Sequence, residues 1–256
     1  MISRRNTPQR RHAILALLNE QGEVSVDALA QHFATSEVTI RKDLAELEKN
    51  GLLLRRYGGA VCMPQELIGE PAQPVSRHKQ AIAGAAVGLI REHARIIIDS
   101  GSTTAAMIPQ LGYKPGLVVM TNSLSVANAL RDIEHEPVLL MTGGTWDPHS
   151  ESFQGQVAEQ VLRSYDFDQL FIGADGIDLE RGTTTFNELL RLSRVMAEVA
   201  REVIVMVESD KVGRRIPNLE LPWSSIHTLI TDDRLDDRAA EQIHARGIQL
   251  ILASAS

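Results

Sequence analysis

The chain has 256 residues, of which 43% are hydrophobic and 23% are charged, as in an ordinary globular protein with one large or two smaller domains. No apolar run approaches the roughly 18 residues of a membrane span, and no apolar segment follows the basic N-terminus, so neither a transmembrane helix nor a secretory signal is predicted. A single cysteine, Cys62, excludes an internal disulfide framework. We therefore expect a cytoplasmic protein with no membrane partner.

The formal net charge of -7 is unevenly distributed along the chain. Residues 1–60 contain nine Lys and Arg against seven Asp and Glu, which gives +2, and the remaining 17 basic and 26 acidic residues give -9. A change of sign between segments predicts two domains with different partners. Because salt screens charges beyond roughly 8 Å, an acidic protein can still bind DNA through a basic face.

Three helices and a hairpin are predicted in residues 1–60. The first helix begins after Thr7-Pro8, the second is capped by Ser25, and the third begins at Ser36 and stops at Gly51. The inward-facing residues of the third helix are predicted to be Val38, Ile40, Leu44 and Leu47. A hairpin over residues 52–61 follows, and this order of elements is that of a winged helix-turn-helix domain.

The third helix carries the candidate DNA-binding side chains. In a helix-turn-helix, the second helix of the motif enters the major groove with its N-terminal residues against base edges and phosphates. The residues placed there are Ser36, Glu37, Thr39, Arg41 and Lys42, and the hairpin adds Arg55 and Arg56. The alternative is a solvated helix in which Arg41 and Lys42 pair with Asp43 and Glu46. The basic first helix and the basic hairpin around it favour DNA binding.

A second domain is predicted at residues 77–253, after a proline-containing linker at 61–76. In it, short apolar runs alternate with helical stretches. The runs are 95–98, 117–120, 137–141, 170–172, 203–207, 228–230 and 248–252. Buried strands that alternate with helices predict an open, mostly parallel α/β sheet.

Polar loops follow several of these strands, at the sheet edge where ligands bind in open α/β folds. Gly101 allows backbone amides to approach an anion, and the hydroxyls after it lie at a predicted helix N-terminus. Each loop alone is more often structural, so it is their number that predicts a binding site. The candidate residues are Asp99, Gly101, Ser102, Thr103, Thr104, Thr121, Asn122, Ser123, Gly143, Gly144, Asp175, Asp178, Glu188 and Lys211.

Three N-terminal segments have a distinctive order and spacing: Arg10-x3-Ile14-x3-Leu18, Ser36 to Leu44, and Arg56 to Ala60. They resemble the signature of the DeoR family of bacterial repressors. The segments Asp99 to Thr104 and Gly173 to Asp178 are most similar to the galactitol, glucitol and N-acetylgalactosamine repressors. The resemblance implies a repressor of a sugar or sugar-alcohol operon, released from its operator by a small phosphorylated effector. It also implies a sensor domain similar in fold to ribose-5-phosphate isomerase.

Two segments depart from the pattern of that family. Trp146-Asp147 follows the paired glycines where many relatives carry a basic residue. Asp210 stands beside Lys211 where relatives tend to have serine. An added acid next to the lysine disfavours a doubly charged anion unless Arg214 or Arg215 compensates, so the phosphorylation of the effector is less firmly predicted than DNA binding.

Two other functions remain open at this point. A sugar-phosphate isomerase with a basic accessory domain would use Asp99, Glu188 and Lys211 for proton transfer, and a nonspecific nucleic-acid module would not distinguish an operator from random DNA. Binding without turnover is favoured, because an enzyme does not need the first sixty residues. One recognition helix makes few base contacts, so a homo-oligomer, a dimer or tetramer, is expected on paired half-sites. The scattered histidines predict no metal site, and we expect no other cofactor.

Overall fold

The computed structural model describes residues 10–11, 13–15, 17–18, 22–49, 53–56, 58–62, 75–148, 150–187 and 190–255. The predicted helix start at Thr7-Pro8, the helix stop at Gly51, most of the linker and Glu188 lie outside these residues. The chain divides into two compact units, Met1–Gln73 and Pro74–Ser256. Among the helices described, none is long and apolar enough to cross a membrane.

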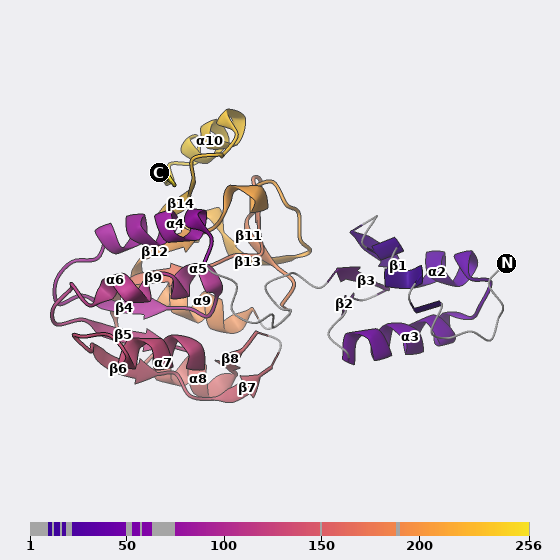
Figure 1. The fold of residues 1–256 in the computed structure, drawn as a ribbon, viewed down its shortest axis with the longest axis horizontal. Coiled ribbons are helices and arrows are strands. Elements are labelled where there is room, and N and C mark those ends of the chain that lie inside the picture. The colour runs from indigo at the N-terminus through magenta and orange to yellow at the C-terminus, as the bar shows by residue number, and fades with distance from the viewer. Residues whose placement is uncertain are drawn as a thin grey trace. The chain divides into compact units, whose positions relative to one another are not determined.

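The N-terminal unit combines helices with a three-stranded antiparallel sheet (Figure 1). The described residues between 10 and 18 are helical, and α2 (Val26–His32) and α3 (Glu37–Lys49) follow. The sheet has the order β1 (Glu23–Ser25), β3 (Gly59–Cys62) and β2 (Leu53–Arg56). The predicted winged helix-turn-helix fold is confirmed.

Strand β1 was not predicted, because three residues are too short for an alternating pattern to be recognised. It pairs with β3 in the register Glu23↔Val61 to Ser25↔Gly59. A Cβ atom at Gly59 would lie 2.2 Å from the backbone oxygen of Val24. Glycine at this position therefore allows β1 to join the hairpin, and the missing side chain was the sequence signal for it.

The prediction that Val38 faces the core is wrong. Its side chain is 60% exposed, whereas Ile40, Leu44 and Leu47 are buried. A helix turns by about 100° per residue, so Val38 lies about 200° from Ile40 and points to the opposite side. The three buried residues follow the i, i+4, i+7 pattern of a single face, and Val38 does not belong to it.

Asp43 of α3 is a buried charge that ties this helix to the first one. Its carboxylate accepts hydrogen bonds from Arg10 Nε at 2.5 Å and from Arg11 Nε at 3.0 Å. The side chains of Arg10 and Asp43 are only 7% and 3% exposed. Asp43 therefore pairs with the first helix and not with Arg41 or Lys42, as the solvated-helix alternative required.

We expect Asp43→Asn to lower the free energy of unfolding of the N-terminal unit by about 3 kcal/mol, because Arg10 would stay buried without its counter-charge. Urea denaturation followed by circular dichroism measures this change. The matched control is Glu37→Gln, which removes an acid from an exposed pair on the same helix and should cost less than about 1 kcal/mol. Equal costs for the two variants would contradict the assignment.

The C-terminal unit is built on a seven-stranded sheet (Figure 1). Its strand order is β15 (Gln249–Ala253), β14 (Thr228–Asp232), β12 (Ala200–Met206), β9 (Phe167–Ile172), β4 (Arg95–Ile98), β5 (Val118–Thr121) and β6 (Val138–Met141). Every neighbouring pair in this sheet is parallel. Each predicted apolar run overlaps one of these strands, so the predicted open parallel sheet is confirmed.

Apolar clusters cover both faces of this sheet. Along β4, Ile96 and Ile98 pack into one cluster and Ile97 into the other. Residues of α4 (Arg77–Gly88), α6 (Ile108–Leu111) and α7 (Leu124–Arg131) complete the first cluster. Residues of α8 (Gln156–Leu162), α9 (Arg191–Glu198) and α10 (Asp237–His244) complete the second. Burial on both faces explains why the strands are continuous apolar runs.

The strand order reverses between β4 and β9, because β5 and β6 extend one side of the sheet and β12, β14 and β15 extend the other. Such a reversal opens a crevice at the carboxyl ends of the two central strands, where ligands bind. Two small antiparallel sheets were not predicted. They consist of β7 (Thr145–Asp147) with β8 (Ser152–Gln154), and of β10 (Gly176–Asp178), β11 (Gly182–Thr185) and β13 (Asn218–Pro222).

Candidate DNA-binding surface and effector site

The outer side of α3 presents most of the predicted DNA-binding residues. Ser36, Glu37, Arg41 and Lys42 are exposed, and Thr39 is half-buried. Ser36 caps the helix, because its Oγ accepts a hydrogen bond from Thr39 N at 3.3 Å. Arg41 Nη2 donates to Glu37 Oε2 at 2.8 Å, and both side chains are about half exposed. An ion pair this exposed is weak, so Arg41 is able to exchange Glu37 for a phosphate or a base.

Val38 is the residue on this surface that sequence reasoning missed. It lies three and four residues before Arg41 and Lys42, so the three side chains share one side of α3. Among the described residues, Lys42 makes no ion pair that would hold it away from a ligand. An exposed aliphatic side chain in the first turn of a recognition helix is suited to the methyl group of thymine.

Three arginines line a groove between α3 and the β2–β3 hairpin: Arg41, Arg55 and Arg56. Arg55 Nη1 lies 3.6 Å from Glu48 Oε2, and Arg56 Nη1 donates to Glu23 Oε2 at 3.0 Å. Acidic residues of the same unit therefore partly neutralise the positive charge of the β2–β3 hairpin, which was not predicted from the sequence. A groove with three guanidinium groups still suits a phosphate backbone, since phosphates offer the stronger acceptors.

Asp99 directly follows β4 at the carboxyl edge of the central sheet. Its Oδ1 accepts a hydrogen bond from Asn122 Nδ2 at 2.8 Å, and Asn122 Oδ1 accepts one from Ser100 N at 3.1 Å. Asn122 is 1% exposed, so it fixes Asp99 and is not itself open to a ligand. Burial raises the pKa of Asp99 to about 6, against the hydrogen bond from Asn122 and with a further contribution from the charge of Asp175.

The loop after Asp99 leads into a helix of only four residues, α5 (Ser102–Ala105). One turn has a small dipole, so the predicted anion site cannot rest on the helix N-terminus. Thr104 is buried, and its hydroxyl lies 2.8 Å from Asp99 O and 2.9 Å from Gly101 O, which closes the loop. Thr103 is also buried, which leaves Ser102 as the exposed hydroxyl. Lys79 Nζ donates to Ser102 Oγ at 2.9 Å.

Of the two predicted aspartates after β9, only Asp175 has a partly accessible side chain. Its Oδ2 accepts hydrogen bonds from Thr185 Oγ1 at 2.6 Å and Phe186 N at 3.1 Å. Asp178 is 2% exposed and accepts from Arg181 Nε at 2.7 Å, so it serves the β10–β11 turn. Burial alone would raise the pKa of Asp178, but Arg181 and backbone donors outweigh burial and lower it.

Lys211 lies in the 3-10 turn η2 (Ser209–Lys211) that follows β12. Its ammonium donates to Ala174 O at 3.2 Å, which connects the loops after β9 and β12. The neighbouring acid, Asp210, is bound by Arg214 through Nη2 to Oδ2 at 2.6 Å. Arg215 pairs instead with Glu180 at 3.2 Å. The compensation that the unusual acid requires therefore comes from Arg214.

The remaining predicted residues mainly shape the backbone. Ser123 caps α7 by accepting from Val126 N at 3.4 Å, and Thr121 Oγ1 accepts from Ser123 N at 3.1 Å. Gly143 and Gly144 have φ angles of 59° and 111°, and a Cβ at Gly144 would lie 2.5 Å from Gln154 O. These residues position the loops after β5 and β6 and are not prominent as ligand contacts.

Glu220 on β13 is a buried carboxyl that sequence reasoning missed, because it lies within a strand and not in a loop at a strand end. It accepts hydrogen bonds from Ser193 Oγ at 2.7 Å and Thr183 Oγ1 at 3.3 Å. Burial raises its pKa to about 8, the Ser193 bond acts in the opposite direction, and the charges of Asp99 and Asp175 raise it further. Three acids therefore share one region of the C-terminal unit.

Glu220 should make the stability of the protein depend on pH. Because its pKa is raised from 4.5 to about 8, the folded chain keeps a proton that the unfolded chain loses in this range. As the pH rises from 4.5 to about 8, the contribution of Glu220 to the free energy of unfolding should therefore decrease, by at most about 1.4 kcal/mol per pH unit. Urea denaturation between pH 5 and pH 8 should show a flatter profile for Glu220→Gln, and an unchanged profile for the control Glu180→Gln. Parallel profiles for wild type and Glu220→Gln would refute the raised pKa.

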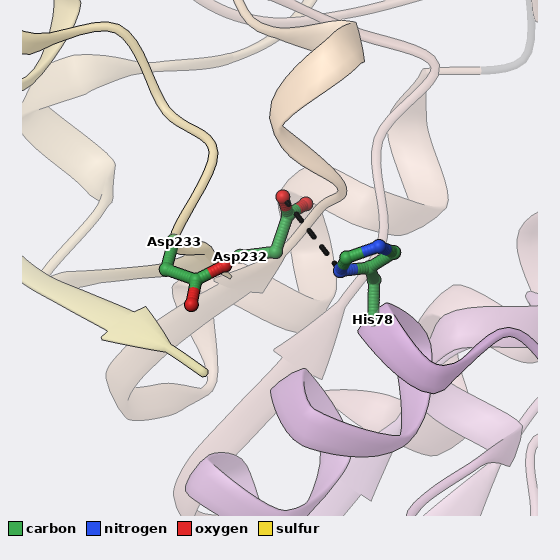
Figure 2. A group of neighbouring side chains, drawn as sticks. All are labelled: His78, Asp232 and Asp233. Atoms are coloured by element: carbon green, nitrogen blue, oxygen red, sulfur yellow. Dashed lines mark ion pairs between the residues drawn. The ribbon is translucent and has the colours of Figure 1, made fainter. Parts of the chain in front are cut away.

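His78, Asp232 and Asp233 form a compact group whose ligand atoms lie within 4.8 Å of one another (Figure 2). The carboxylate of Asp232 is already occupied, because Arg234 Nε donates to it at 2.6 Å and Ser209 N at 2.8 Å. Burial alone would raise the pKa of Asp232, but these donors hold it well below its usual range. A metal ion would have to displace the guanidinium, so the group is better suited to joining α4, η2 and the end of β14.

Two family matches together span most of the chain: residues 10–66 match the DeoR-like helix-turn-helix domain, and residues 75–233 the DeoR C terminal sensor domain. A protein of Escherichia coli O157:H7, named for transcriptional repression of the aga operon, is 40% identical over 96% of this chain and 94% of its own. The HTH-type transcriptional regulator GlpR of Haloferax volcanii is 32% identical, over 95% of this chain and 96% of its own. A solved D-ribose-5-phosphate isomerase in complex with phospho-erythronic acid is 22% identical, with 55% of each chain covered and a TM-score of 0.40.

The two matched domains explain the two units described above. The helix-turn-helix domain implies binding to DNA, and the sensor domain implies binding of a small effector. Proteins of this kind are transcriptional regulators and not enzymes, so the isomerase alternative is set aside. On the strength of both domains and of a relative that is 40% identical over almost its full length, this chain belongs to the DeoR family of transcriptional regulators.

Proposed function

We propose that the chain represses a carbohydrate catabolic operon and is released from its operator by a small phosphorylated sugar or sugar alcohol. The observation that carries this proposal is the pairing of a DNA-binding domain with a sensor domain in which loops at the strand ends hold the partly accessible carboxylates of Asp99 and Asp175, and in which Lys79 donates to Ser102. The relative named for the aga operon supports N-acetylgalactosamine or a related sugar as the class of effector.

On the DNA side, α3 enters the major groove with Val38, Arg41 and Lys42 toward the bases and phosphates. Arg55 and Arg56 contact the backbone beside it, since they line the same groove as Arg41. A helix with so few contacts needs a second copy on a neighbouring half-site, so the regulator acts as a homo-oligomer.

On the effector side, Asp99 and Asp175 accept hydrogen bonds from the hydroxyl groups of the sugar, because an ionised carboxylate can only accept hydrogen bonds and a hydroxyl group can donate them. Ser102, at the start of α5, supplies a hydroxyl donor, and Lys211, which is 8% exposed and donates to Ala174 O, adds positive charge from beneath. An effector that binds the DNA-free arrangement more tightly than the DNA-bound arrangement shifts the population away from the operator.

The DNA-binding role predicts that Arg41→Ala weakens binding to the DNA upstream of the chain's own gene by about tenfold, through loss of a base or phosphate contact. Fluorescence anisotropy at fixed salt measures this. Arg131→Ala, which removes an exposed arginine from the sensor unit, should leave the affinity unchanged. If Arg41 binds phosphate, the salt dependence of binding should also fall by about one unit of slope. Unaltered DNA affinity in a folded Arg41→Ala protein would exclude this residue from the interface.

The effector role is tested by titrating the protein–DNA complex with the phosphate esters of N-acetylgalactosamine, galactitol and glucitol, and with the three parent compounds. We expect at least one ester to release the DNA at a concentration at which its parent compound does not, because the ammonium groups favour an anion. Release by none of the compounds would contradict a sugar-phosphate effector. Equal release by an ester and its parent would show that the phosphate is not recognised.

A further inference from the structure

The first turn of α4 connects two of the loops at the edge of the central sheet. Ser76 caps this helix by accepting a hydrogen bond from Lys79 N at 3.1 Å, and its hydroxyl donates to Glu208 Oε1 at 2.9 Å. Lys79 Nζ donates to Ser102 Oγ at 2.9 Å and lies 3.7 Å from Glu208 Oε2. One lysine thus bridges the loop after β4 and the loop after β12.

Lys79 and Ser102 present the chemistry of an anion-binding pair. Ser102 Oγ accepts its hydrogen bond from Lys79, so the hydroxyl hydrogen of Ser102 is left to donate elsewhere. An ammonium has three donors, more than Ser102 and Glu208 together occupy. The side chain of Lys79 is 17% exposed, which shields its charge from bulk water while leaving it reachable. A positive charge in such a position binds an oxyanion more strongly than a fully solvated lysine does.

We propose that Lys79 and Ser102 hold the anionic group of the effector, and that Glu208, which competes for Lys79, passes this event to the start of α4. This inference rests on the proposed function, since it assigns one group of the same effector. A phosphate carries more charge than a carboxylate and has three acceptor oxygens, so it displaces Glu208 from Lys79. Glu208 is also the partner of Ser76, and its rearrangement alters the first turn of α4.

The first turn of α4 lies close to the segment that joins the two units. Ser76 lies at the N-terminal boundary of the sensor unit, next to the segment that leads to the DNA-binding unit. A change in its bond to Glu208 therefore acts on the chain that joins the two units. A local exchange of ion-pair partners at Lys79 thus affects DNA binding by the other unit, as in other ligand-driven switches.

The proposal predicts effects of opposite sign for two variants. Lys79→Met should weaken binding of the phosphate ester about tenfold or more, because it removes a charge-assisted hydrogen bond. Glu208→Gln should tighten binding about twofold to fivefold, because it keeps an acceptor for Ser76 and removes the competing charge. Arg77→Met is the matched control: it removes an exposed charge from the same turn and should change the affinity less than twofold.

Isothermal titration calorimetry of the full chain with the three esters named above, and with inorganic phosphate, measures these affinities. If wild type binds no ester, both the sugar-phosphate effector and this inference fail. If wild type binds an ester and folded Lys79→Met binds it equally well, only the inference fails. Weaker ester binding by Glu208→Gln would refute the proposal that Glu208 competes with the ester for Lys79. Lys79→Arg, which keeps the positive charge, should recover part of the affinity lost in Lys79→Met.

Transmission is tested at Ser76. Ser76→Gly removes the bond to Glu208 but keeps a residue that is tolerated at a helix N-cap, and Ser76→Thr retains the hydroxyl. For Ser76→Gly we expect the ester to bind within about twofold of its wild-type affinity. We also expect the ester to weaken DNA binding by a smaller factor than it does in wild type, because the coupling between the two sites is reduced. Ser76→Thr should behave like wild type. An unchanged ratio in Ser76→Gly would show that the signal leaves the site by another route.

Discussion

A carboxyl group can leave water only when a cation or several hydrogen-bond donors take the place of its hydration, or when it keeps its proton, and this constraint orders both units of the protein. Asp43 meets it with Arg10 and Arg11, and by doing so it joins the first helix to α3. Because Asp43 faces inward, Arg41 and Lys42 remain on the outside of the same helix. The buried carboxylate of α3 is thus satisfied by the first helix, and the exposed basic side chains of α3 are not needed for that purpose.

The same constraint separates structural acids from candidate functional acids in the sensor unit. Asp178 and Asp232 have arginine partners and lowered pKa values, and each holds a turn or a strand end together. Asp99 and Glu220 are buried with hydroxyl and amide donors, and their pKa values are raised. Carboxyls with raised pKa values that lie close to one another are characteristic of binding sites. Among the described residues, no arginine pairs with the carboxyl of Asp99 or Glu220, although Arg194 Nε donates to the backbone oxygen of Glu220 at 3.2 Å.

Much of the fold followed from periodicity. The seven central strands are buried on both faces, so each one is a continuous apolar run that needs no knowledge of its neighbours. The small strands behave differently: β11 is a run of glycine and threonines whose partners, β10 and β13, lie on either side of it in the sheet. Its pairing with β13 joins distant segments, which a local pattern does not contain, and its neighbour β10 is only three residues long. The prediction for Val38 was wrong even though the sequence shows that it lies two residues before Ile40, a spacing that puts the two side chains on opposite sides of a helix.

The candidate site was predictable only in part. The sequence places Asp99, Asp175 and Lys211 after strands, and parallel strands end at one edge of a sheet, but their contact with an effector stays a prediction. Glu220 and Lys79 were missed because one lies inside a strand and the other inside a helix. Only tertiary packing brings Lys79 against Ser102 and brings Glu220 within the electrostatic influence of Asp99 and Asp175. Arg214 was named as one of two compensating residues, and only geometry distinguishes it from Arg215.

The short strand β1 has a mechanical consequence for the DNA-binding unit. By pairing with β3 between the first helix and α2, it fastens the hairpin to the helices on their N-terminal side, while α3 leads into β2 on the other. A hairpin held at both ends cannot swing as a loose arm. The distance between α3 and Arg55 is then set by the fold of this unit. If α3 and Arg55 contact DNA as proposed, this set distance favours operators whose grooves have a matching width, in addition to any preference for particular bases.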